Sequence, residues 1–301
     1  MQWALGEDMR AASSSWPKPL GDSDIERRLT LLEREYKPNL RTSDFTSAIS
    51  KVDLAYRPNG LLIDLGGGIS SHNGVLAQLG MTVYVVDLLS DYWEHRFTDP
   101  TTITQEVQAL EACGVRFVRA DILSHDLREH FSENSVDVIT SFDCVEHFHH
   151  SPRAALESAV QVLKPGGTML IDVPNAANIR KRVALLFGRT NYLPFDEFYY
   201  NSPYLGHVRE YTIGDLRQLA RNLGARRYRI FGRNFIHGTW VERIPFPIRK
   251  SLDLVLQTFP GLCGSLFLEI TKSQEHQGLT ESPRPSWLPT KSNDSGRLIW
   301  S

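Results

Sequence analysis

The sequence predicts a doubly wound α/β domain, and two patterns carry the prediction. From residue 61 onward, short apolar runs alternate with stretches of helical periodicity, and a glycine turn follows the first run. Nearly continuous apolar runs are typical of a parallel sheet whose two faces are both covered by helices. At 301 residues the chain is long enough for one such domain with added segments, which is the organisation we expect.

Five apolar runs are predicted to be strands: LLID, TVYVVD, VRFVRA, VDVITS and TMLIDVP. Between them, helices are expected near Gly74–Leu79, Thr101–Cys113 and Pro152–Leu163. A glycine is placed to end or follow each helix: Gly80, Gly114 and Gly166. This alternation is that of a doubly wound unit.

A further helix is predicted from Thr212, because the spacing of Thr212 and Asp215 is that of an N-terminal cap. Gly224 marks its end. Two more apolar runs, RRYRIF and SLFLEIT, are predicted to be strands that follow this helix.

The segments on either side of the domain have different patterns. Residues 1–57 are predicted as an N-terminal helical extension, because Ser23 and Glu26 have capping-box spacing. Apolar residues then recur at helical intervals: Ile25, Leu29, Leu32 and Tyr36. The domain is expected over residues 58–272, with a substrate-side insertion at about 175–211. Residues 273–301 are rich in Pro and Ser and are expected to be disordered.

Composition narrows the partners and the compartment. The formal charge of −2, from 33 basic and 35 acidic residues, gives no field that would recruit nucleic acid, so we expect a small or neutral partner. Cys113, Cys144 and Cys263 lie far apart, which suggests neither a disulfide framework nor a zinc ribbon. No apolar run approaches the roughly 20 residues that span a bilayer. The chain is therefore expected to be cytoplasmic.

The glycine turn has the features of a cofactor loop. The strand ending at Asp64 runs into Gly66, Gly67 and Gly68, where missing Cβ atoms let the backbone turn sharply and approach a ligand. The polar residues that follow could cap a helix whose amides face an anionic group: Ser70, Ser71 and Asn73. About 20 residues on, Asp87 ends the next strand, where an acidic side chain usually accepts hydrogen bonds from ribose hydroxyls.

Two glycine templates fit this turn equally well. The NAD pattern G-x-G-x-x-G, started at Gly66, requires a glycine where the chain has Ser71. The methyltransferase form D-x-G-x-G-x-G finds Asp64, Gly66 and Gly68 but has Ser70 at its last position. Each template misses one glycine, so the turn alone leaves both cofactors open.

Five motifs in order, LLIDLGGGIS, VVDL, RADIL, VDVITSFDCVEHF and LKPGGTMLIDVPN, resemble those of the type 11/23 group of class I S-adenosylmethionine (SAM) dependent methyltransferases. The resemblance covers about residues 58–272 and implies a Rossmann-like sheet of seven strands with the last antiparallel. It also implies a set of cofactor-binding residues: Asp64, Gly66, Gly67, Gly68, Asp87, Leu88, Asp121, Ile122 and Asp143. In this family a carboxylate at the position of Asp121 faces the adenine amino group, with Ile122 against the ring. Asp121 could otherwise be an ordinary helix cap.

Ser70 stands where the family pattern has glycine. This departure affects the expected geometry of the first loop and not the assignment to the family. The Lys164–Gly167 turn resembles the family's turn before strand five, and its expected role is structural.

A polar cluster follows the fourth predicted strand. Asp143, Glu146 and His147 have i, i+3, i+4 spacing, which on a helical turn places them on one face. Glu146 and His147 could deprotonate a substrate. Alternatively the three could hold a divalent metal, as the similar segment does in ubiquinone-pathway O-methyltransferases. A third interpretation has Asp143 capping the helix and touching the cofactor while His147 packs. His149 and His150 are given no role.

The predicted insertion is rich in aromatic residues: Tyr192, Phe195, Phe198, Tyr199, Tyr200 and Tyr204. Aromatics with a few polar anchors suit a pocket for a ring, a sugar or an acyl chain. The following GHVREYT stretch resembles the family's loop that closes over the active site. It adds His207 as a catalytic candidate, and the substrate-binding candidates are Tyr200, Tyr204, Arg209 and Tyr211. The alternative is an irregular loop packed on the sheet edge, with Arg209 paired to a carboxylate.

Near the C-terminus, Arg243, Arg249 and Lys250 flank the apolar stretch IPFPIRKSLDLVLQTF, which could touch a membrane surface or a lipid-linked substrate, or pack on its own sheet. The predicted function is methyl transfer from SAM to an O or N nucleophile of a small-molecule, glycan or lipid-linked acceptor. The alternatives are an NAD-dependent oxidoreductase and a catalytically inactive SAM-fold binding protein.

Overall fold

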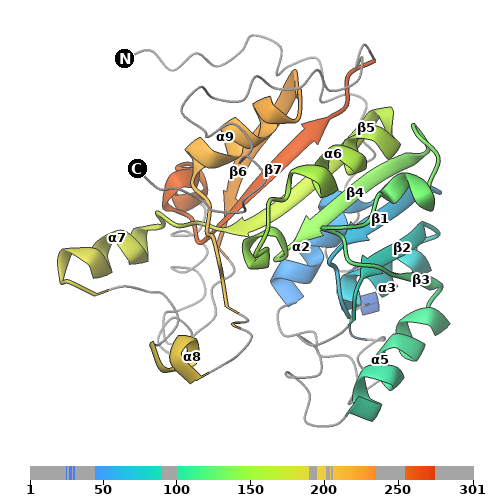
Figure 1. Ribbon diagram of the computed structural model, residues 1–301, viewed down its shortest axis with the longest axis horizontal. Helices are drawn as coiled ribbons and strands as arrows, with labels where there is room; N and C mark the ends of the chain where they lie inside the picture. The colour runs from blue at the N-terminus through green and yellow to red at the C-terminus, as the bar shows by residue number, and fades with distance from the viewer. Residues whose placement is uncertain are drawn as a thin grey trace, which may run out of the picture.

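A computed structural model describes residues 25, 27, 28, 30, 45–89, 100–189, 195–200, 204, 206–234 and 255–274. Its centre is one seven-stranded sheet with the order β3-β2-β1-β4-β5-β7-β6 (Figure 1). The strands are β1 (Leu61–Leu65), β2 (Thr82–Asp87), β3 (Val115–Arg119), β4 (Val136–Phe142), β5 (Leu163–Pro174), β6 (Arg227–Arg233) and β7 (Ser265–Thr271).

Strands β1 to β5 pair in parallel, whereas β7 runs antiparallel to both β5 and β6. The predicted Rossmann-like sheet with an antiparallel last strand is therefore confirmed. The chain builds β2 and β3 on one side of β1, and β4 on the other. In open α/β sheets, ligands bind outside the carboxyl ends of the strands at such a reversal of strand order. The topology thus directs attention to the carboxyl ends of β1, β2 and β4.

Helices cover both faces of the sheet (Figure 1). They are α2 (Phe45–Ala55), α3 (Ser71–Gln78), α5 (Pro100–Ala112), α6 (Arg153–Val162), α7 (Ile179–Leu186), α8 (Phe195–Tyr200) and α9 (Ile213–Asn222). The described residues also form the short 3₁₀ turns η2 (Leu127–Glu129), η3 (Val145–His147) and η4 (Pro260–Leu262). The predicted helices are present, and α3 begins three residues before the predicted Gly74.

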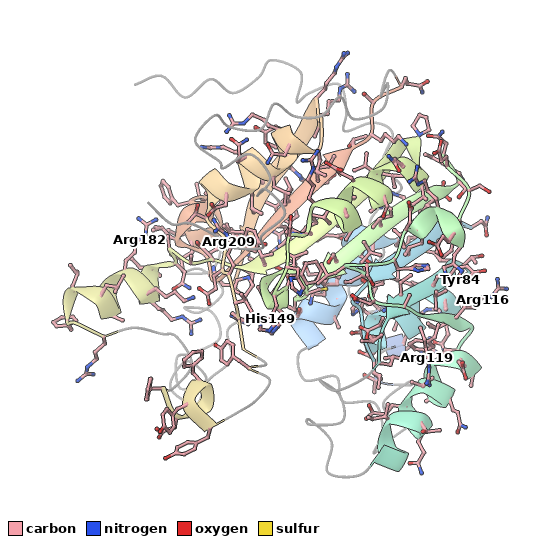
Figure 2. All side chains as sticks on the ribbon, in the orientation of Figure 1. Tyr84, Arg116, Arg119, His149, Arg182 and Arg209 are labelled. Carbon is pink, nitrogen blue, oxygen red and sulfur yellow. The ribbon has the colours of Figure 1, made fainter. Side chains whose placement is uncertain are left out.

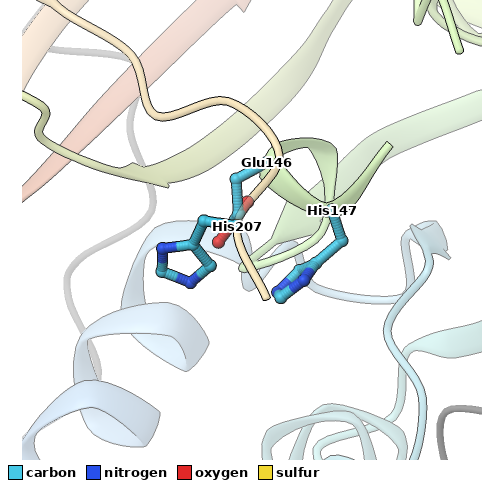
Figure 3. A group of neighbouring side chains, drawn as sticks. All are labelled: Glu146, His147 and His207. Atoms are coloured by element: carbon cyan, nitrogen blue, oxygen red, sulfur yellow. The ribbon is translucent and has the colours of Figure 1, made fainter. Parts of the chain in front are cut away.

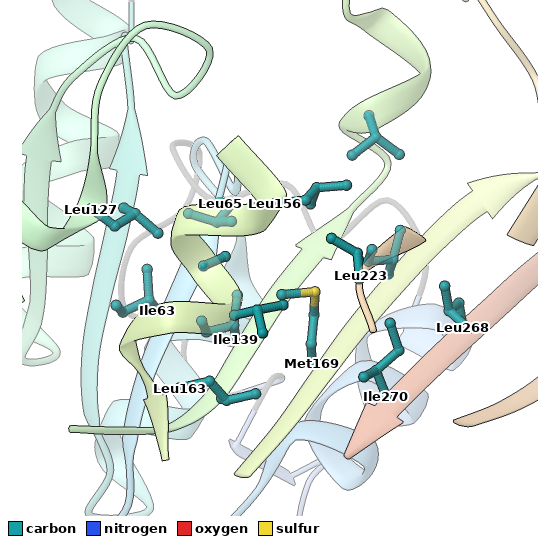
Figure 4. Packing of buried hydrophobic residues seen from close by; sticks show 14 of the residues in the cluster. Ile63, Leu65, Leu127, Ile139, Leu156, Leu163, Met169, Leu223, Leu268 and Ile270 are labelled. Atoms are coloured by element: carbon teal, nitrogen blue, oxygen red, sulfur yellow. The ribbon is translucent and has the colours of Figure 1, made fainter. Parts of the chain in front are cut away.

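Two hydrophobic cores lie on opposite faces of the sheet. Ile63 and Leu65 of β1 pack with α6 and α9 on one face (Figure 4), and Leu62 packs with α2, α3 and α5 on the other. This alternation along one strand is the period-2 pattern of a sheet covered on both sides. Helix α2 belongs to the second core, because Val52 and Ala55 are fully buried in it.

Glycines and a capping box set the element ends as predicted. Gly80 and Gly114 follow α3 and α5 with φ of 92° and 98°, in the left-handed region where a Cβ is disfavoured. At α9, the side chain of Thr212 accepts from the amide of Asp215, whose carboxylate in turn accepts from the Thr212 amide.

The Lys164–Gly167 turn lies within the long strand β5. The Gly166 amide donates to the carbonyl of Lys272, and the Lys272 amide donates to the carbonyl of Gly167. These bonds tie the start of β5 to the end of β7, which gives the turn the structural role expected of it.

Several predictions fall on residues that the structure does not describe. Of the predicted helix after Ser23, only residues 25, 27, 28 and 30 are described, all helical. Tyr192, the stretch from Arg243 to residue 254 and the tail after residue 274 lie outside the described residues. Among the helices that are described, none combines the length and the apolar character needed to cross a bilayer.

Candidate functional site

The loop after β1 requires its glycines for packing within the protein. Gly66 has φ of 65°, and a Cβ there would lie 2.1 Å from Sγ of Cys144. A Cβ on Gly67 would lie 1.9 Å from Oδ2 of Asp64. Because real Cβ atoms do not approach other atoms so closely, no side chain fits at either position without a rearrangement of the loop.

Asp64 anchors this loop from inside. The side chain is fully buried, and its carboxylate accepts hydrogen bonds from Asn73 at 2.7 Å and Thr140 at 2.7 Å, with His72 at 3.4 Å. Burial alone would raise the pKa of Asp64, but its bonds to His72, Asn73 and Thr140 hold that pKa below the ordinary value. The structure therefore gives Asp64 a role in holding the loop, and its predicted contact with the cofactor stays a prediction.

The helix after the loop is capped differently from the prediction. Ser70 is the N-cap of α3, but its side chain makes no capping bond to the helix and donates instead to the carbonyl of Gly67 at 2.7 Å. Asn73 is committed to Asp64. Ser70 thus closes the loop on itself at the position where the family pattern has glycine.

Asp87 and Asp121 end neighbouring strands, since Asp87 pairs with Arg119 in the register of β2 and β3. The carboxylate of Asp87 accepts the amides of Gly68 at 3.0 Å and Leu89 at 2.7 Å. Burial raises the pKa of Asp87. Each of its oxygens carries a second lone pair, which could accept from a ribose hydroxyl. Asp121 is exposed and accepts from the amide of Leu123 at 2.9 Å.

Two apolar side chains complete this edge. Leu88 is exposed to solvent directly after β2, where a flat ligand ring could cover it. Ile122 lies beside the glycine loop, with its Cδ1 3.4 Å from the position of a Cβ on Gly66. Leu89 has φ of 50°, a strained conformation for a bulky residue of the kind that clusters at ligand sites. The residues present therefore fit an adenosine held over the loop.

Lys51 of α2 reaches the carboxyl ends of β4 and β5. Its Nζ lies 2.6 Å from Asp143 Oδ2 and 3.7 Å from Asp172 Oδ2. Burial would lower the pKa of Lys51, but the two carboxylates reverse this and raise it. Burial, followed by repulsion from Asp143, raises the pKa of the fully buried Asp172 well above its ordinary value. The sequence pattern does not distinguish Lys51 from other helical lysines.

The cluster after β4 is assembled from two segments about 60 residues apart. Glu146, His147 and His207 each present a ligand atom within 4.8 Å of the others (Figure 3). The amides of Val208 and Arg209 donate to the carbonyl of Glu146 at 2.8 and 3.1 Å, which fixes the 206–211 segment against η3.

Asp143 does not join this cluster, contrary to the prediction from its spacing. The turn is a 3₁₀ helix that begins only at Val145, with Cys144 and not Asp143 as its N-cap. Asp143 has φ of 50°, which directs the chain out of helical geometry, and its carboxylate pairs with Lys51. His207 takes the place beside Glu146 and His147 that was predicted for Asp143.

Burial sets the protonation of the cluster. Glu146 is fully buried, and neither carboxylate oxygen has a hydrogen-bond partner within the described part of the chain. Burial and the nearby Asp143 raise the pKa of Glu146 to about 8. Burial and the neighbouring His147 and Lys181 lower the pKa of His207 to about 4. At neutral pH the protein therefore holds a protonated Glu146 beside a neutral His207.

Hydrogen bonds orient both imidazole rings. Nδ1 of His147 lies 3.3 Å from the carbonyl of Gly206, and Nδ1 of His207 lies 3.2 Å from Oε1 of Glu210. A carbonyl can only accept, so Nδ1 of His147 carries a proton, and in a neutral ring the lone pair is then on Nε2. The carboxylate of Glu210 likewise can only accept, so Nδ1 of His207 carries a proton and Nε2 is its basic nitrogen. Glu210 is also ion-paired with Lys181 of α7.

The predicted substrate residues are spread over different environments. Tyr211 is buried, with its hydroxyl 3.5 Å from the carbonyl of Val145. Arg209 is exposed and pairs with Asp215 at 2.9 Å, which is the alternative foreseen for it. The carbonyl of Tyr204 lies 3.1 Å from Nε2 of His149, and Tyr200 is exposed on α8. The structure does not bring these four side chains into one pocket.

Comparison with known proteins gives one family match. A family model described as a methyltransferase domain matches residues 38–227, which is more than half of the chain. No curated protein sequence matches the chain.

Solved structures with a similar fold include three that are described as methyltransferases. One, from Thermotoga maritima, is a SAM-dependent methyltransferase and possible histamine N-methyltransferase, with 14% identity, TM-score 0.47 and coverage of 83% of this chain and 95% of its own. A SAM-dependent methyltransferase from Archaeoglobus fulgidus has 12% identity, TM-score 0.49 and coverage of 81% and 99%. Phosphoethanolamine N-methyltransferase 2 of Haemonchus contortus, bound to SAM, has 14% identity, TM-score 0.49 and coverage of 86% and 62%. The ligands and acceptors in these names belong to those proteins.

Proposed function

The chain belongs to the methyltransferase domain family and is a SAM-dependent methyltransferase, and on this premise we propose that it methylates an oxygen or nitrogen nucleophile of a small-molecule, glycan or lipid-linked acceptor. The observation that carries the proposal is the convergence of Glu146, His147 and His207 at the sheet edge that also holds the predicted cofactor residues. This arrangement can take a proton from an acceptor hydroxyl or amine.

We propose that the cofactor lies across the ends of β1, β2 and β3. Asp87 would accept from the ribose hydroxyls, and Asp121 and Ile122 would face the adenine. Gly66, Gly67 and Gly68 are inferred to let the backbone pass close to the methionine portion. SAM supplies an activated methyl group on a sulfonium, so the chain's own part is to align the acceptor, exclude water and move a proton.

For the proton we propose His147 as the acceptor group. Its Nδ1 contact with Gly206 leaves Nε2 as the basic nitrogen. Because the pKa of Glu146 is about 8, Glu146 is neutral at neutral pH and does not compete with His147 for the proton. His207, held by Glu210, would orient the acceptor from the other side. General-base assistance of this kind contributes roughly 10²- to 10⁴-fold to the rate.

A second mechanism uses the same three residues to hold a divalent cation. Both carboxylate oxygens of the buried Glu146 lack a hydrogen-bond partner among the described residues, and two imidazoles lie next to it. This donor set suits zinc or another transition ion. When bound, such an ion would lower the pKa of an acceptor hydroxyl. The two mechanisms differ in their response to a chelator.

Incubation with methyl-labelled SAM and fractionated cell extract, followed by mass identification of the labelled product, tests the function. We expect a labelled small molecule, glycan or lipid-linked product. His147→Ala should lower its turnover by about 10²-fold or more, with less than about a twofold change in SAM affinity. His150→Ala is the matched control, because His150 is an exposed neighbour that we assign no role. A wild-type chain that labels nothing, or an unimpaired His147→Ala variant, would refute the proposal.

A chelator separates the two mechanisms. If His147 acts as a base, turnover in excess EDTA should equal turnover without it. If the three residues hold a cation, EDTA should abolish turnover and added Zn²⁺ or Mg²⁺ should restore it in the wild type but not in Glu146→Gln.

A further inference from the structure

Helix α7 presents an apolar stripe to solvent. Ile179, Val183, Leu186 and Phe187 follow i, i+4, i+7, i+8 spacing, which puts them on one side of a helix. In a surface helix this stripe would normally face the core. Here all four are exposed, Leu186 by 82% and Phe187 by 75%, and α7 buries none of its residues.

Positive charge borders the stripe. The segment Ile179 to Arg189 contains four basic residues and no acidic one. At 100° per residue, Arg180 and Arg182 fall on either side of the stripe. Both are exposed, as is Arg189. Arg182 also donates to the carbonyl of Gly261 in η4. Figure 2 labels Arg182 on α7.

Helix α8 adds aromatic side chains to the same end of the molecule (Figure 1). Four of its six residues are exposed aromatics: Phe195, Phe198, Tyr199 and Tyr200. Exposed apolar clusters of this extent mark interaction sites. Amphipathic helices with basic borders, and aromatic side chains at headgroup depth, are the two features that proteins use to seat on a bilayer surface.

The charges of α7 favour a lipid surface over a second copy of the chain. Two copies of α7 packed stripe to stripe would bring Arg180 and Arg182 of one helix close to those of the other, which is unfavourable. An anionic headgroup layer complements the same arginines. We propose that α7 and α8 form a docking surface for a bilayer that carries anionic phospholipids.

This surface is connected to the candidate catalytic cluster. Helix α7 begins directly after β5 with Asn178 as its N-cap, and Lys181 on its inner side pairs with Glu210, which contacts His207. A bilayer seated on α7 would therefore lie beside the edge where an acceptor must bind. Docking itself does not depend on the proposed methyl acceptor, but it favours a lipid-linked one.

Sedimentation with vesicles tests the proposal. We expect the full chain to sediment with vesicles containing phosphatidylglycerol and only weakly with pure phosphatidylcholine. The double variant Leu186→Ser/Phe187→Ser should bind at least about tenfold more weakly, because two large side chains leave the interface. The matched control is Val255→Ser/Phe259→Ser, which removes residues that are 58% and 59% exposed at the end of the other candidate membrane stretch. This control should bind like the wild type.

Two double variants that remove arginines test the electrostatic part of vesicle binding independently. Arg180→Gln/Arg189→Gln should weaken binding to the anionic vesicles by about tenfold and reduce its dependence on salt. Arg217→Gln/Arg227→Gln, which removes two exposed arginines elsewhere, should have little effect. Thermal unfolding of each variant verifies that it is folded.

Three outcomes would overturn the inference: no sedimentation with either vesicle, loss of binding only in the Val255/Phe259 variant, or a concentration-dependent dimer that Leu186→Ser/Phe187→Ser dissolves. Methyl transfer that persists without vesicle binding would reject docking alone. Vesicle binding without methyl transfer would reject the proposed function alone.

Discussion

Buried ionisable side chains meet at the carboxyl edge of the sheet, and their protonation determines what this edge can do. Glu146 and Asp172 are both fully buried, and burial raises both of their pKa values. Lys51 places a positive charge beside two of the carboxylates at this edge, since its Nζ lies 2.6 Å from Asp143 Oδ2 and 3.7 Å from Asp172 Oδ2. With a pKa of about 8 for Glu146 and about 4 for His207, the imidazole of His207 is neutral at neutral pH and can accept a proton while Glu146 keeps its own.

The stability of the protein should depend on pH through Glu146. Its pKa is about 8 in the folded chain against 4.5 ordinarily, so between these values the folded chain holds a proton that the unfolded chain has lost. This contribution to stability is complete below about pH 4.5 and is lost as the pH rises through about 8. The free energy of unfolding of the wild type should therefore fall between pH 5 and 9 by up to a few kcal/mol.

Urea denaturation at these two pH values, with a chelator present, measures this effect. Glu146→Gln should remove most of the fall, whereas Glu111→Gln, at an exposed position on α5, should retain it. Equal pH slopes for Glu146→Gln and the wild type would mean that Glu146 is charged in the folded protein.

Gly66 offers a test of the loop that separates strain from crowding. Gly66→Ala places a Cβ at φ of 65°, which costs about 1–2 kcal/mol, and also 2.1 Å from Cys144 Sγ, which adds about 1–3 kcal/mol of overpacking. Gly188→Ala has the same φ of 65° with nothing within 4 Å of the new atom, so it should show the first cost alone. Denaturation midpoints measure the difference in stability loss between the two variants. Equal losses would mean that the loop or Cys144 shifts enough to make room for the new Cβ.

At the scale of single residues, the sequence identified positions but could not give their contacts within the protein. The motif singled out Asp64, and the structure adds that its carboxylate accepts hydrogen bonds from Asn73 and Thr140. Spacing alone suggested Asp143 as a partner of Glu146 and His147. The actual partner, His207, depends on how the 206–211 segment folds back onto η3, and only the resemblance to the family's closing loop pointed to it.

At the scale of elements, α2 is the part that connects the chain's N-terminal side to the site. It contributes Val52 and Ala55 to one core and Lys51 to the carboxylates of β4 and β5. The strands were predictable because buried parallel strands are continuous apolar runs. The contact of Lys51 with Asp143 was not, because no local pattern encodes a pairing across 92 residues. The predicted domain boundary at residue 57 remains a prediction.

Removing the Lys51 amine should be costly. Lys51→Met leaves the fully buried Asp172 without the cation 3.7 Å away, and the loss of one partner from a buried ion pair costs up to about 3–5 kcal/mol, whereas solvent can replace the amine at Asp143, whose side chain is 57% exposed. Lys164→Met is the control, since Lys164 pairs with Asp137 at 2.8 Å but is partly exposed, and such pairs contribute about 1 kcal/mol or less. Urea denaturation of the two variants should show this contrast. Similar losses would indicate that Lys51 is solvated in solution.

At the scale of the whole molecule, the reversal of strand order at β1 gathers the ends of several strands into one place. The glycine loop, Asp87 and the cluster of Glu146, His147 and His207 come from segments that begin near residues 61, 82, 136 and 206. The topology makes them neighbours along one edge of the sheet. Periodicity predicted the alternation of strands and helices. The antiparallel seventh strand followed only from the family resemblance, because pairing direction leaves no mark in the pattern of a single strand.

The central claim is that Asp87 and Asp121 hold the adenosine of SAM over the glycine loop, and calorimetric titration with S-adenosylhomocysteine tests it most directly. We expect wild-type binding, and a loss of about 1.5–3 kcal/mol in Asp87→Ala, roughly 10- to 100-fold in affinity, for each charged hydrogen bond removed. Asp121→Ala should also bind more weakly. Asp126→Ala, which removes a half-buried carboxylate paired with Arg128 outside the site, should bind like the wild type. Unchanged affinity in both Asp87→Ala and Asp121→Ala, with the folds intact, would contradict the account.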